Sequence, residues 1–397
     1  MRMNKKREIT TPKLRFPKYI HAEQWELTQF KNLLDYERPD LYIVNSNNYK
    51  DTGVPVLTAN KSFILGYTDE SNNIYNNIPV IIFDDFTTEK KYVDFPFKIK
   101  SSAIKILKPK GDNILKFIFE LMNTIKFDAK EHKRYYISAY QNLEIFVPHD
   151  IGEQQKISDC LSSLDELIDA ESRKLEKLEK YKKGLMQKLF PAIGKTMPEW
   201  RFPEFQGHGE WKAKSIKNSC DMFSGGTPDT SKKEFYGGDI PFIRSAEIDK
   251  SSTELFITEL GLKNSSAKMV KKGDILIALY GANSGEVALS QIDGAINQAI
   301  LCLRHETNNM FVYHYLSHIK NWIISKYIQG GQGNLSGQII KAVSLYFPQP
   351  KEQEKIADCL SEIDVIITEQ TNKVEKLKTH KNGLMQQLFP SMEEADI

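Results

Sequence analysis

One cluster of acidic residues has the side-chain types that a nuclease uses. Asp84-Asp85 is followed by Glu89-Lys90, and two carboxylates before a third acid and a lysine form a nuclease-like pattern. Such spacing occurs often by chance in polar segments. We therefore interpret these residues as a surface loop and assign them no catalysis.

The glycine-rich segments could bind a cofactor, because glycine lets the backbone approach a ligand closely. Phe223-Ser224-Gly225-Gly226 resembles the glycine loop that binds the methyl donor in methyltransferases. However, the chain contains no Asn-Pro-Pro-Tyr or Asp-Pro-Pro-Tyr sequence, and no G-x-x-x-x-G-K-[ST] phosphate loop. The sequence lacks a complete adenine methyltransferase or nucleotide site.

The remaining residues of metal-binding or nucleophilic type are scattered. The four cysteines are Cys160, Cys220, Cys302 and Cys359, none in a C-x-x-C spacing. The eight histidines form no metal-ligand motif either. We predict small buried thiols, no metal site and no catalytic residue, so the chain is expected to be a binding or assembly component.

Composition limits the class of protein. The 397 residues suggest two to three domains, and the net charge is only +2. Residues 1–20 hold seven Lys or Arg and one acid, Glu8, so this arm either contacts phosphates or is a solvated tail. No apolar run reaches the ~18 residues of a membrane span, and the start lacks a signal-peptide core. We expect a cytoplasmic protein without membrane contact.

The longest pattern in the chain is a segment that occurs twice. Residues 154–191 and 353–390 align without a gap, and 21 of the 38 positions are identical. Each copy predicts a long helix that ends at Leu-Phe-Pro, since proline cannot continue a helix. Between Ile157 and Leu189 that helix would run roughly 50 Å at ~1.5 Å per residue.

Apolar residues in both copies follow the 4-3 spacing of a coiled-coil seam. Glu171 and Lys182 interrupt it in the first copy, and Gln370 and Lys381 interrupt it in the second. We expect the two helices to pair antiparallel, with Glu171 near Lys381 or its neighbours. The alternative is that each helix packs on its own domain. The predicted pairing residues are Ile157, Leu161, Leu164, Ile168, Leu175, Leu178, Leu185, Leu189, Ile356, Leu360, Ile363, Ile367, Val374, Leu377, Leu384 and Leu388.

A second repeat precedes each globular region. Residues 12–19 and 198–205 both read P-x-[LW]-R-F-P-x-[YF], with tryptophan thirteen residues after the first proline. Between this leading segment and the helix, the two halves show little similarity. The expected domains are 1–150 (arm and first recognition domain), 151–191 (central helix), 192–350 (second recognition domain), 351–390 (C-terminal helix) and 391–397 (tail).

Each globular region alternates short apolar runs with polar turns, which predicts a mixed α/β domain with a largely β core. Leu115–Met122 and Met310–Tyr327 are expected to be helices, and Tyr92–Phe97 a strand. The predicted fold class is therefore α/β, with two mixed domains separated by two long antiparallel helices in a pseudo-two-fold internal repeat.

The layout resembles the specificity (S) subunit of type I DNA restriction-modification systems. The resemblance covers nearly the whole chain. It rests on the Glu-Gln-x-Lys-Ile starts and Gly-Leu-Met-Gln-x-Leu-Phe-Pro ends of both helices, and on residues 55–59, 82–85, 225–228, 237–243 and 273–276.

The resemblance implies that two target recognition domains each read one half of a split, asymmetric double-stranded DNA site. It implies that the helices set the spacer and dock two modification (M) subunits that bind S-adenosylmethionine and methylate adenine. Two restriction (R) subunits would add ATP- and Mg-dependent translocation and cleavage. This chain itself would hold no cofactor and would not be an enzyme.

The candidate DNA contacts lie in polar or basic loops between strands, where side chains can reach base edges. In the first domain they are Asn60, Lys61, Lys90, Lys91, Lys133, Arg134, Tyr135 and Tyr136. In the second they are Thr227, Lys232, Lys233, Arg244, Asn283, Gln332 and Asn334. The near-neutral charge leaves one alternative open, a coiled-coil protein-interaction scaffold that does not bind DNA.

Overall fold

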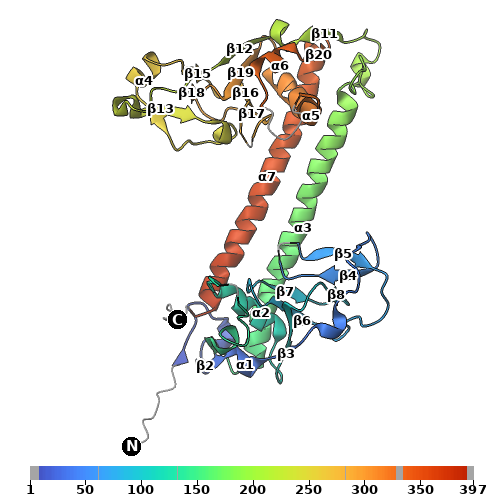
Figure 1. The fold of residues 1–397 in the computed structure, drawn as a ribbon, viewed down its shortest axis with the longest axis vertical. Coiled ribbons are helices and arrows are strands. Elements are labelled where there is room, and N and C mark those ends of the chain that lie inside the picture. The colour runs from blue at the N-terminus through green and yellow to red at the C-terminus, as the bar shows by residue number, and fades with distance from the viewer. Residues whose placement is uncertain (1–8, 61, 132, 282, 328–333, 391–397) are drawn as a thin grey trace, which may run out of the picture. The chain divides into compact units, whose positions relative to one another are not determined.

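The computed structural model describes residues 9–60, 62–131, 133–281, 283–327 and 334–390, which form two compact units. Unit 1 runs to Glu171 and resumes at Lys373, whereas unit 2 is Ser172–Asn372. The boundary falls inside both long helices, α3 (Ile151–Leu189) and α7 (Pro350–Leu388) (Figure 1). Each unit therefore contains one globular domain and a portion of each long helix.

The domain in unit 1 is built on a four-stranded antiparallel sheet of order β3-β9-β6-β7. A second sheet of order β5-β4-β8 and a third of order β1-β2-β10 complete it. The elements are β1 (Ile9–Thr10), β2 (Trp25–Gln29), α1 (Phe30–Leu33), β3 (Leu34–Glu37), β4 (Val54–Leu57), β5 (Ile64–Thr68), β6 (Val80–Asp84), β7 (Lys90–Val93), β8 (Lys98–Ile99), β9 (Ile104–Pro109), α2 (Leu115–Thr124) and β10 (Glu144–Val147).

The domain in unit 2 has a four-stranded antiparallel sheet of order β12-β19-β16-β17 and a second sheet of order β14-β13-β18-β15. The elements are β11 (Lys212–Ser215), β12 (Cys220–Ser224), β13 (Tyr236–Ile243), β14 (Phe256–Ile257), α4 (Glu259–Lys263), β15 (Lys268–Val270), β16 (Ile275–Ala278), β17 (Val287–Leu289), β18 (Gly294–Ile296), β19 (Ile300–His305), α5 (Asn309–Tyr327), α6 (Gly337–Ala342) and β20 (Ser344–Phe347).

The two domains share one topology although their sequences differ. The order β3-β9-β6-β7 corresponds strand for strand to β12-β19-β16-β17. In both domains the second sheet contains a parallel pair, β4 with β8 and β13 with β18. The predicted helices α2 and α5 each follow the last strand of the four-stranded sheet, β9 and β19 respectively. The duplication therefore extends through the domain interiors, where sequence similarity does not reveal it.

Each domain is closed by pairing the strand that follows its leading segment with its last strand. In unit 1, β2 pairs with β10, and in unit 2, β11 pairs with β20. Because the closing strand runs directly into the long helix, the start of each domain lies beside the start of that helix. Arg15 and Arg201 reinforce this junction: each donates two hydrogen bonds to a helix carboxylate, Glu153 and Glu352 respectively. These two arginine clamps occupy equivalent positions in the two leading segments.

The helices pair antiparallel within each unit, as the seam predicts. In unit 1, Lys373 contacts Glu171, and Lys381 contacts Asp165 at 2.6 Å. In unit 2, Lys182 contacts Asp364. Glu171 therefore pairs with Lys373, and the predicted approach to Lys381 is wrong because Lys381 lies two helical turns further along and is taken by Asp165.

All sixteen predicted pairing residues are buried or half-buried, and those at the seam ends also enter the domain cores. Ile157 and Leu161 share the core of unit 1 with Leu388 and Phe389 from the other helix. In unit 2, Leu189 and Phe190 share a core with Ile356 and Leu360. The helices thus pair with each other and also pack on the domains, which combines the two predicted alternatives.

Candidate nucleic-acid interface

Several candidate residues in unit 1 come together at one end of the four-stranded sheet, where β6 ends and β7 and β9 begin. We call this the loop end. The backbone N–H of Asp85 donates to Ala103 at 2.8 Å, and that of Lys100 donates to Leu57 at 3.0 Å. The loop after α2 joins them, because Tyr135 donates to the carbonyl of Asp85 at 2.8 Å. Four loops that are distant in sequence therefore meet here.

Asn60, Lys90 and Arg134 lie at the loop end of unit 1. The Asn60 carboxamide accepts a hydrogen bond from Thr87 in the β6–β7 turn at 3.4 Å. The Arg134 guanidinium lies 6.0 Å from the ring centre of Phe86 in the same turn and is exposed. Lys90 begins β7 with its ammonium 5.9 Å from the ring of Tyr140, and burial lowers its pKa. Exposed amide and guanidinium groups here can donate to bases or phosphates.

The other candidates in unit 1 are placed less favourably. Tyr135 and Tyr136 are buried, and burial raises the pKa of Tyr136, whose ring packs against Phe83 and Tyr36. The prediction that these two tyrosines contact DNA is wrong. Both belong to the core, because the loop folds inward after Arg134. Lys133 is exposed and pairs with Glu131. Lys91 faces the opposite side of the sheet from Lys90, since strand residues alternate, and Lys61 lies outside the described residues.

The acidic cluster at residues 84–89 is part of the loop-end framework. Asp84 accepts hydrogen bonds from the backbone N–H groups of Phe86 and Thr87, both at 2.9 Å. Asp85 pairs with buried Lys105 at 3.1 Å and accepts from the N–H of Tyr136. Both carboxylates are buried, so interpreting them as a surface loop is wrong. They shape the turn that carries the exposed residues.

The equivalent loop end of unit 2 carries Thr227 together with Gln298, which the sequence analysis missed. Thr227 follows β12, and its hydroxyl donates to the Gln298 side-chain oxygen at 2.7 Å. Gln298 is exposed in the connection between β18 and β19. Only the topology brings these two loops together, so no local sequence signal could have identified the pair.

Glycine at position 225 allows this close approach. A Cβ atom there would lie 1.7 Å from the carbonyl oxygen of Ile296, two residues before Gln298. At Gly226 a Cβ would lie 2.5 Å from the Cβ of Ser266. The glycine pair that resembles a methyl-donor loop therefore lets protein segments pack against each other.

Arg244 is enclosed by carboxylates rather than free to contact DNA. Its guanidinium donates to Glu247 at 3.0 and 2.9 Å and to Glu254 at 2.5 Å. The hydrogen bonds with Glu247 and Glu254 raise the pKa of Arg244, and Arg244 lowers the pKa of the buried Glu247 to about 2. Arg244 therefore stabilises the loop that follows β13 by binding these two carboxylates.

Asn283 and Asn334 lie in neighbouring loops of unit 2. The N–H of Leu335, next to Asn334, donates to the hydroxyl of Ser284 at 3.3 Å. Asn334 is exposed and Asn283 is half-buried. Lys232 and Lys233 are exposed just before β13, and the Lys232 ammonium lies 5.1 Å from the ring of Phe235. Gln332 lies outside the described residues.

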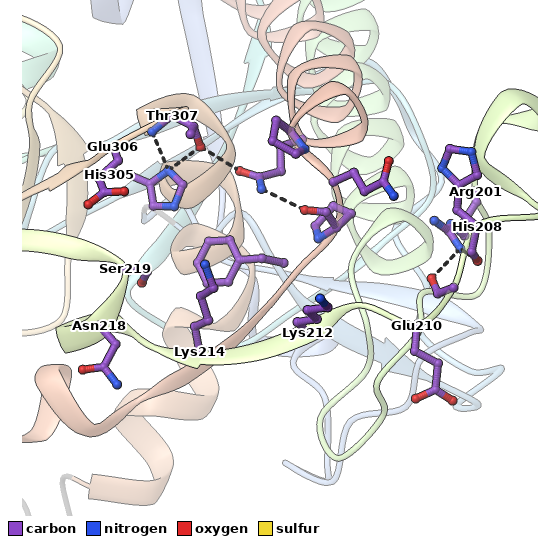
Figure 2. Close-up of a pocket in the computed structure, with 16 residues that line it drawn as sticks. Arg201, His208, Glu210, Lys212, Lys214, Asn218, Ser219, His305, Glu306 and Thr307 are labelled. Carbon is purple, nitrogen blue, oxygen red and sulfur yellow. Dashed lines mark hydrogen bonds between the residues drawn. The ribbon is translucent and has the colours of Figure 1, made fainter.

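A pocket of about 410 Å³ lies beside the arginine clamp of unit 2 (Figure 2). Lys212, Lys214 and His305 line it, and His305 accepts a hydrogen bond from the N–H of Asn308 at 3.0 Å. Gln353 donates to the carbonyl of Pro348 at 2.9 Å. These bonds connect the end of β19 to the residue before α5, and the segment after β20 to α7. The pocket therefore belongs to the repeated framework.

The cysteines of the described residues differ in their burial. Cys220 and Cys302 are buried, and burial raises the pKa of their thiols to about 11 and about 12. Cys160 and Cys359 are free and only half-buried. Among the described residues, no three His, Cys, Asp or Glu side chains are grouped to hold a metal ion. The described helices include none with the length and apolar character to span a membrane.

The topology describes a duplicated protein, and sequence comparison gives its class. A family model described as the type I restriction modification DNA specificity domain matches residues 22–180 and again residues 208–378. The chain therefore belongs to the family of specificity subunits of type I restriction-modification systems.

Similar proteins cover the whole architecture. The EcoR124I/EcoR124II specificity subunit of Escherichia coli is 30% identical over 373 residues, or 88% of this chain and 89% of the relative. The type I S subunit structure from M. genitalium has a TM-score of 0.68 at 17% identity and covers 96% of this chain and 100% of that one. A chain from a structural study of type I complex assembly and conformational transition has a TM-score of 0.54 at 14% identity and covers 92% and 98%.

Proposed function

We propose that the two domains of this specificity subunit each read one half of an asymmetric, bipartite double-stranded DNA site. The observation that carries the proposal is one topology used twice with different loop-end side chains. Asn60 and Arg134 occupy the first loop end, and Thr227, Gln298 and Asn334 occupy the second. Guanidinium and carboxamide groups are the side chains that discriminate base edges in the major groove. Two unlike readers on one framework would recognise two unlike half-sites.

In this proposal the chain is the non-catalytic member of a larger assembly. Two modification subunits with S-adenosylmethionine would dock on the helices and methylate adenine. Two restriction subunits with ATP and Mg would add cleavage, and the assembly would work in the cytoplasm. The relatives are named as type I restriction enzyme specificity subunits, which supports partners of these classes.

Footprinting tests this proposal. The chain bound to its modification subunit is expected to protect two short half-sites separated by an unprotected spacer at physiological salt. Arg134→Ala should weaken one half-site by about 1–3 kcal/mol, and Gln298→Ala should weaken only the other. Uniform protection of any DNA sequence would contradict sequence-specific reading by the two domains. Absence of binding even at low salt, where phosphate contacts are strongest, would favour the protein-interaction scaffold.

A further inference from the structure

In each unit, the connection that enters the second sheet touches the connection that leaves it. In unit 2 this contact is the hydrogen bond from Thr227, between β12 and β13, to Gln298, between β18 and β19. The corresponding connections of unit 1 are β3–β4 and β8–β9. Between them the ammonium of Lys100 donates a hydrogen bond to the side-chain oxygen of Asn47. Both units therefore carry a polar pair at the same topological position, with different side chains.

A network of charged groups positions the pair of unit 1. Asn45, two residues before Asn47, donates to Glu70 from its backbone at 2.9 Å and from its side chain at 3.1 Å. Glu70 in turn pairs at 2.9 Å with Lys98, whose side chain is only 1% exposed. The connection that carries Asn47 is therefore fixed before a ligand binds, which lowers the cost of recognition.

The oxygen of the unit 1 pair is fully used, so the pair presents donors. A carboxamide oxygen accepts two hydrogen bonds, and an ammonium accepts none. The oxygen of Asn47 accepts from Lys100 and also from the hydroxyl of Tyr49 at 3.4 Å. What remains is the amino group of Asn47 and the unused N–H groups of Lys100. Because Asn47 is exposed, the pair presents several donors and a positive charge to solvent.

The unit 2 pair presents acceptors as well as donors. The Gln298 oxygen accepts a hydrogen bond from Thr227 and keeps a second lone pair. The Gln298 amino group has two N–H donors, and the Thr227 hydroxyl oxygen can accept. Both side chains are exposed and uncharged. The two pairs therefore differ in hydrogen-bonding pattern and in charge.

These two patterns match different bases. In the major groove guanine shows two acceptors, N7 and O6, whereas adenine shows the acceptor N7 beside the N6 donor. For this reason lysine is suited to guanine and glutamine to adenine. We propose that Asn47 and Lys100 read a guanine in the first half-site and that Thr227 and Gln298 read an adenine in the second. This inference rests on the proposed function, and it adds two specificity-determining residues and the identity of one base in each half-site.

The test selects DNA from a randomised pool with the full-length chain bound to its modification subunit, and the retained DNA is sequenced. Wild type should prefer guanine by about tenfold or more at one position of the first half-site, the half-site that Arg134→Ala weakens. Lys100→Ala and Asn47→Ala should each reduce that preference by about fivefold or more. Both variants should select the second half-site unchanged, which also shows that they are folded and assembled.

Exchanging the chemistry of the pair gives a sharper measurement. The double substitution Asn47→Thr and Lys100→Gln gives unit 1 the side-chain types of the unit 2 pair, so it should replace guanine by adenine at that position. Lys50→Ala is the matched control, because Lys50 is an exposed lysine in the same connection and pairs with Asp69. This control should keep the guanine.

The outcomes separate this inference from the proposed function. A uniform loss of binding to all sequences in Lys100→Ala, with the salt slope reduced by about one, would make Lys100 a phosphate contact and overturn the inference. The inference also fails if no guanine in the first half-site depends on the pair while Arg134→Ala and Gln298→Ala still weaken separate half-sites. In that case the proposed function stands. If wild type selects no bipartite site, the proposed function fails first and the inference fails with it.

Discussion

His314 on α5 is a buried ionisable residue in the described part of unit 2, within the contact between the domain and α7. It has no exposed surface, its Nε2 lies 3.3 Å from the hydroxyl of Ser361, and its Nδ1 lies 3.8 Å from Asp364. Burial and then the charge of Lys182 lower its pKa to about 3. Burial therefore keeps the ring neutral in the folded protein near neutral pH.

This burial predicts acid sensitivity of unit 2. Below the ordinary histidine pKa of about 6.5 the unfolded chain binds a proton that folded His314 excludes, so folding stability falls as pH decreases toward 3. Between pH 6.5 and 5 the loss should be about 1.6 kcal/mol, because the slope rises toward about 1.4 kcal/mol per pH unit as the unfolded histidine becomes protonated. Urea unfolding at both pH values should show this loss, and His314→Gln should remove most of it. An equal pH dependence in the variant would assign the effect to other groups.

Single residues show where sequence reasoning succeeds and fails. Exposed Asn60, Arg134 and Thr227 reach the loop ends as their loop positions predict. Tyr136 is buried, although it adjoins Arg134, because the backbone turns inward to bond Asp85. Gln298 escaped prediction because its significance comes from a loop 71 residues away. Burial and long-range pairing, which a local pattern does not encode, decide these cases.

At the scale of elements, the arginine clamps connect each leading segment to the start of a long helix. Arg201 is 8% exposed and Glu352 is 1% exposed, and Arg15 with Glu153 repeats the arrangement. Removing one partner of such a pair leaves a buried charge uncompensated, which costs about 3–5 kcal/mol. Each clamp therefore stabilises the strand pair that closes its own domain, β2 with β10 or β11 with β20.

The clamps predict a local effect in each unit. Glu352→Gln should increase hydrogen exchange in β11 and β20, and Glu153→Gln should do so in β2 and β10. Glu354→Gln is the matched control, because Glu354 is an exposed glutamate in the same helical turn as Glu352. Exchange that rises no more in Glu352→Gln than in this control would show that the clamp does not hold the strands.

Elements with strong periodicity were predicted best. The two long helices, α2 and α5 all form where apolar spacing places them. Tyr92–Phe97 was predicted as one strand, but β7 ends at Val93 and β8 begins only at Lys98, with Pro96 between them. A proline has no N–H to pair in a sheet, and that break should have divided the segment. Strands such as β3 and β12 have little alternation of apolar and polar residues. They form because they pair with β9 and β19 respectively.

At the scale of the whole molecule, both long helices run unbroken through the boundary between the two units. If the helices set the spacer of a bipartite site, their length should control it. Inserting seven residues into each helix at the boundary, after Glu171 and after Asn372, keeps the 4-3 seam in phase. Each heptad adds about 10 Å of helix, or about three base pairs at 3.4 Å each. Methylation mapping in cells should then show unchanged half-sites with a spacer about three base pairs longer.

The same insertion in the exposed turn at Gly111, where no heavy atom lies within 4 Å of an added Cβ, should leave the spacer unchanged. A lengthened protein that still methylates the original site would show that DNA bending or partner geometry, rather than helix length, sets the distance between half-sites.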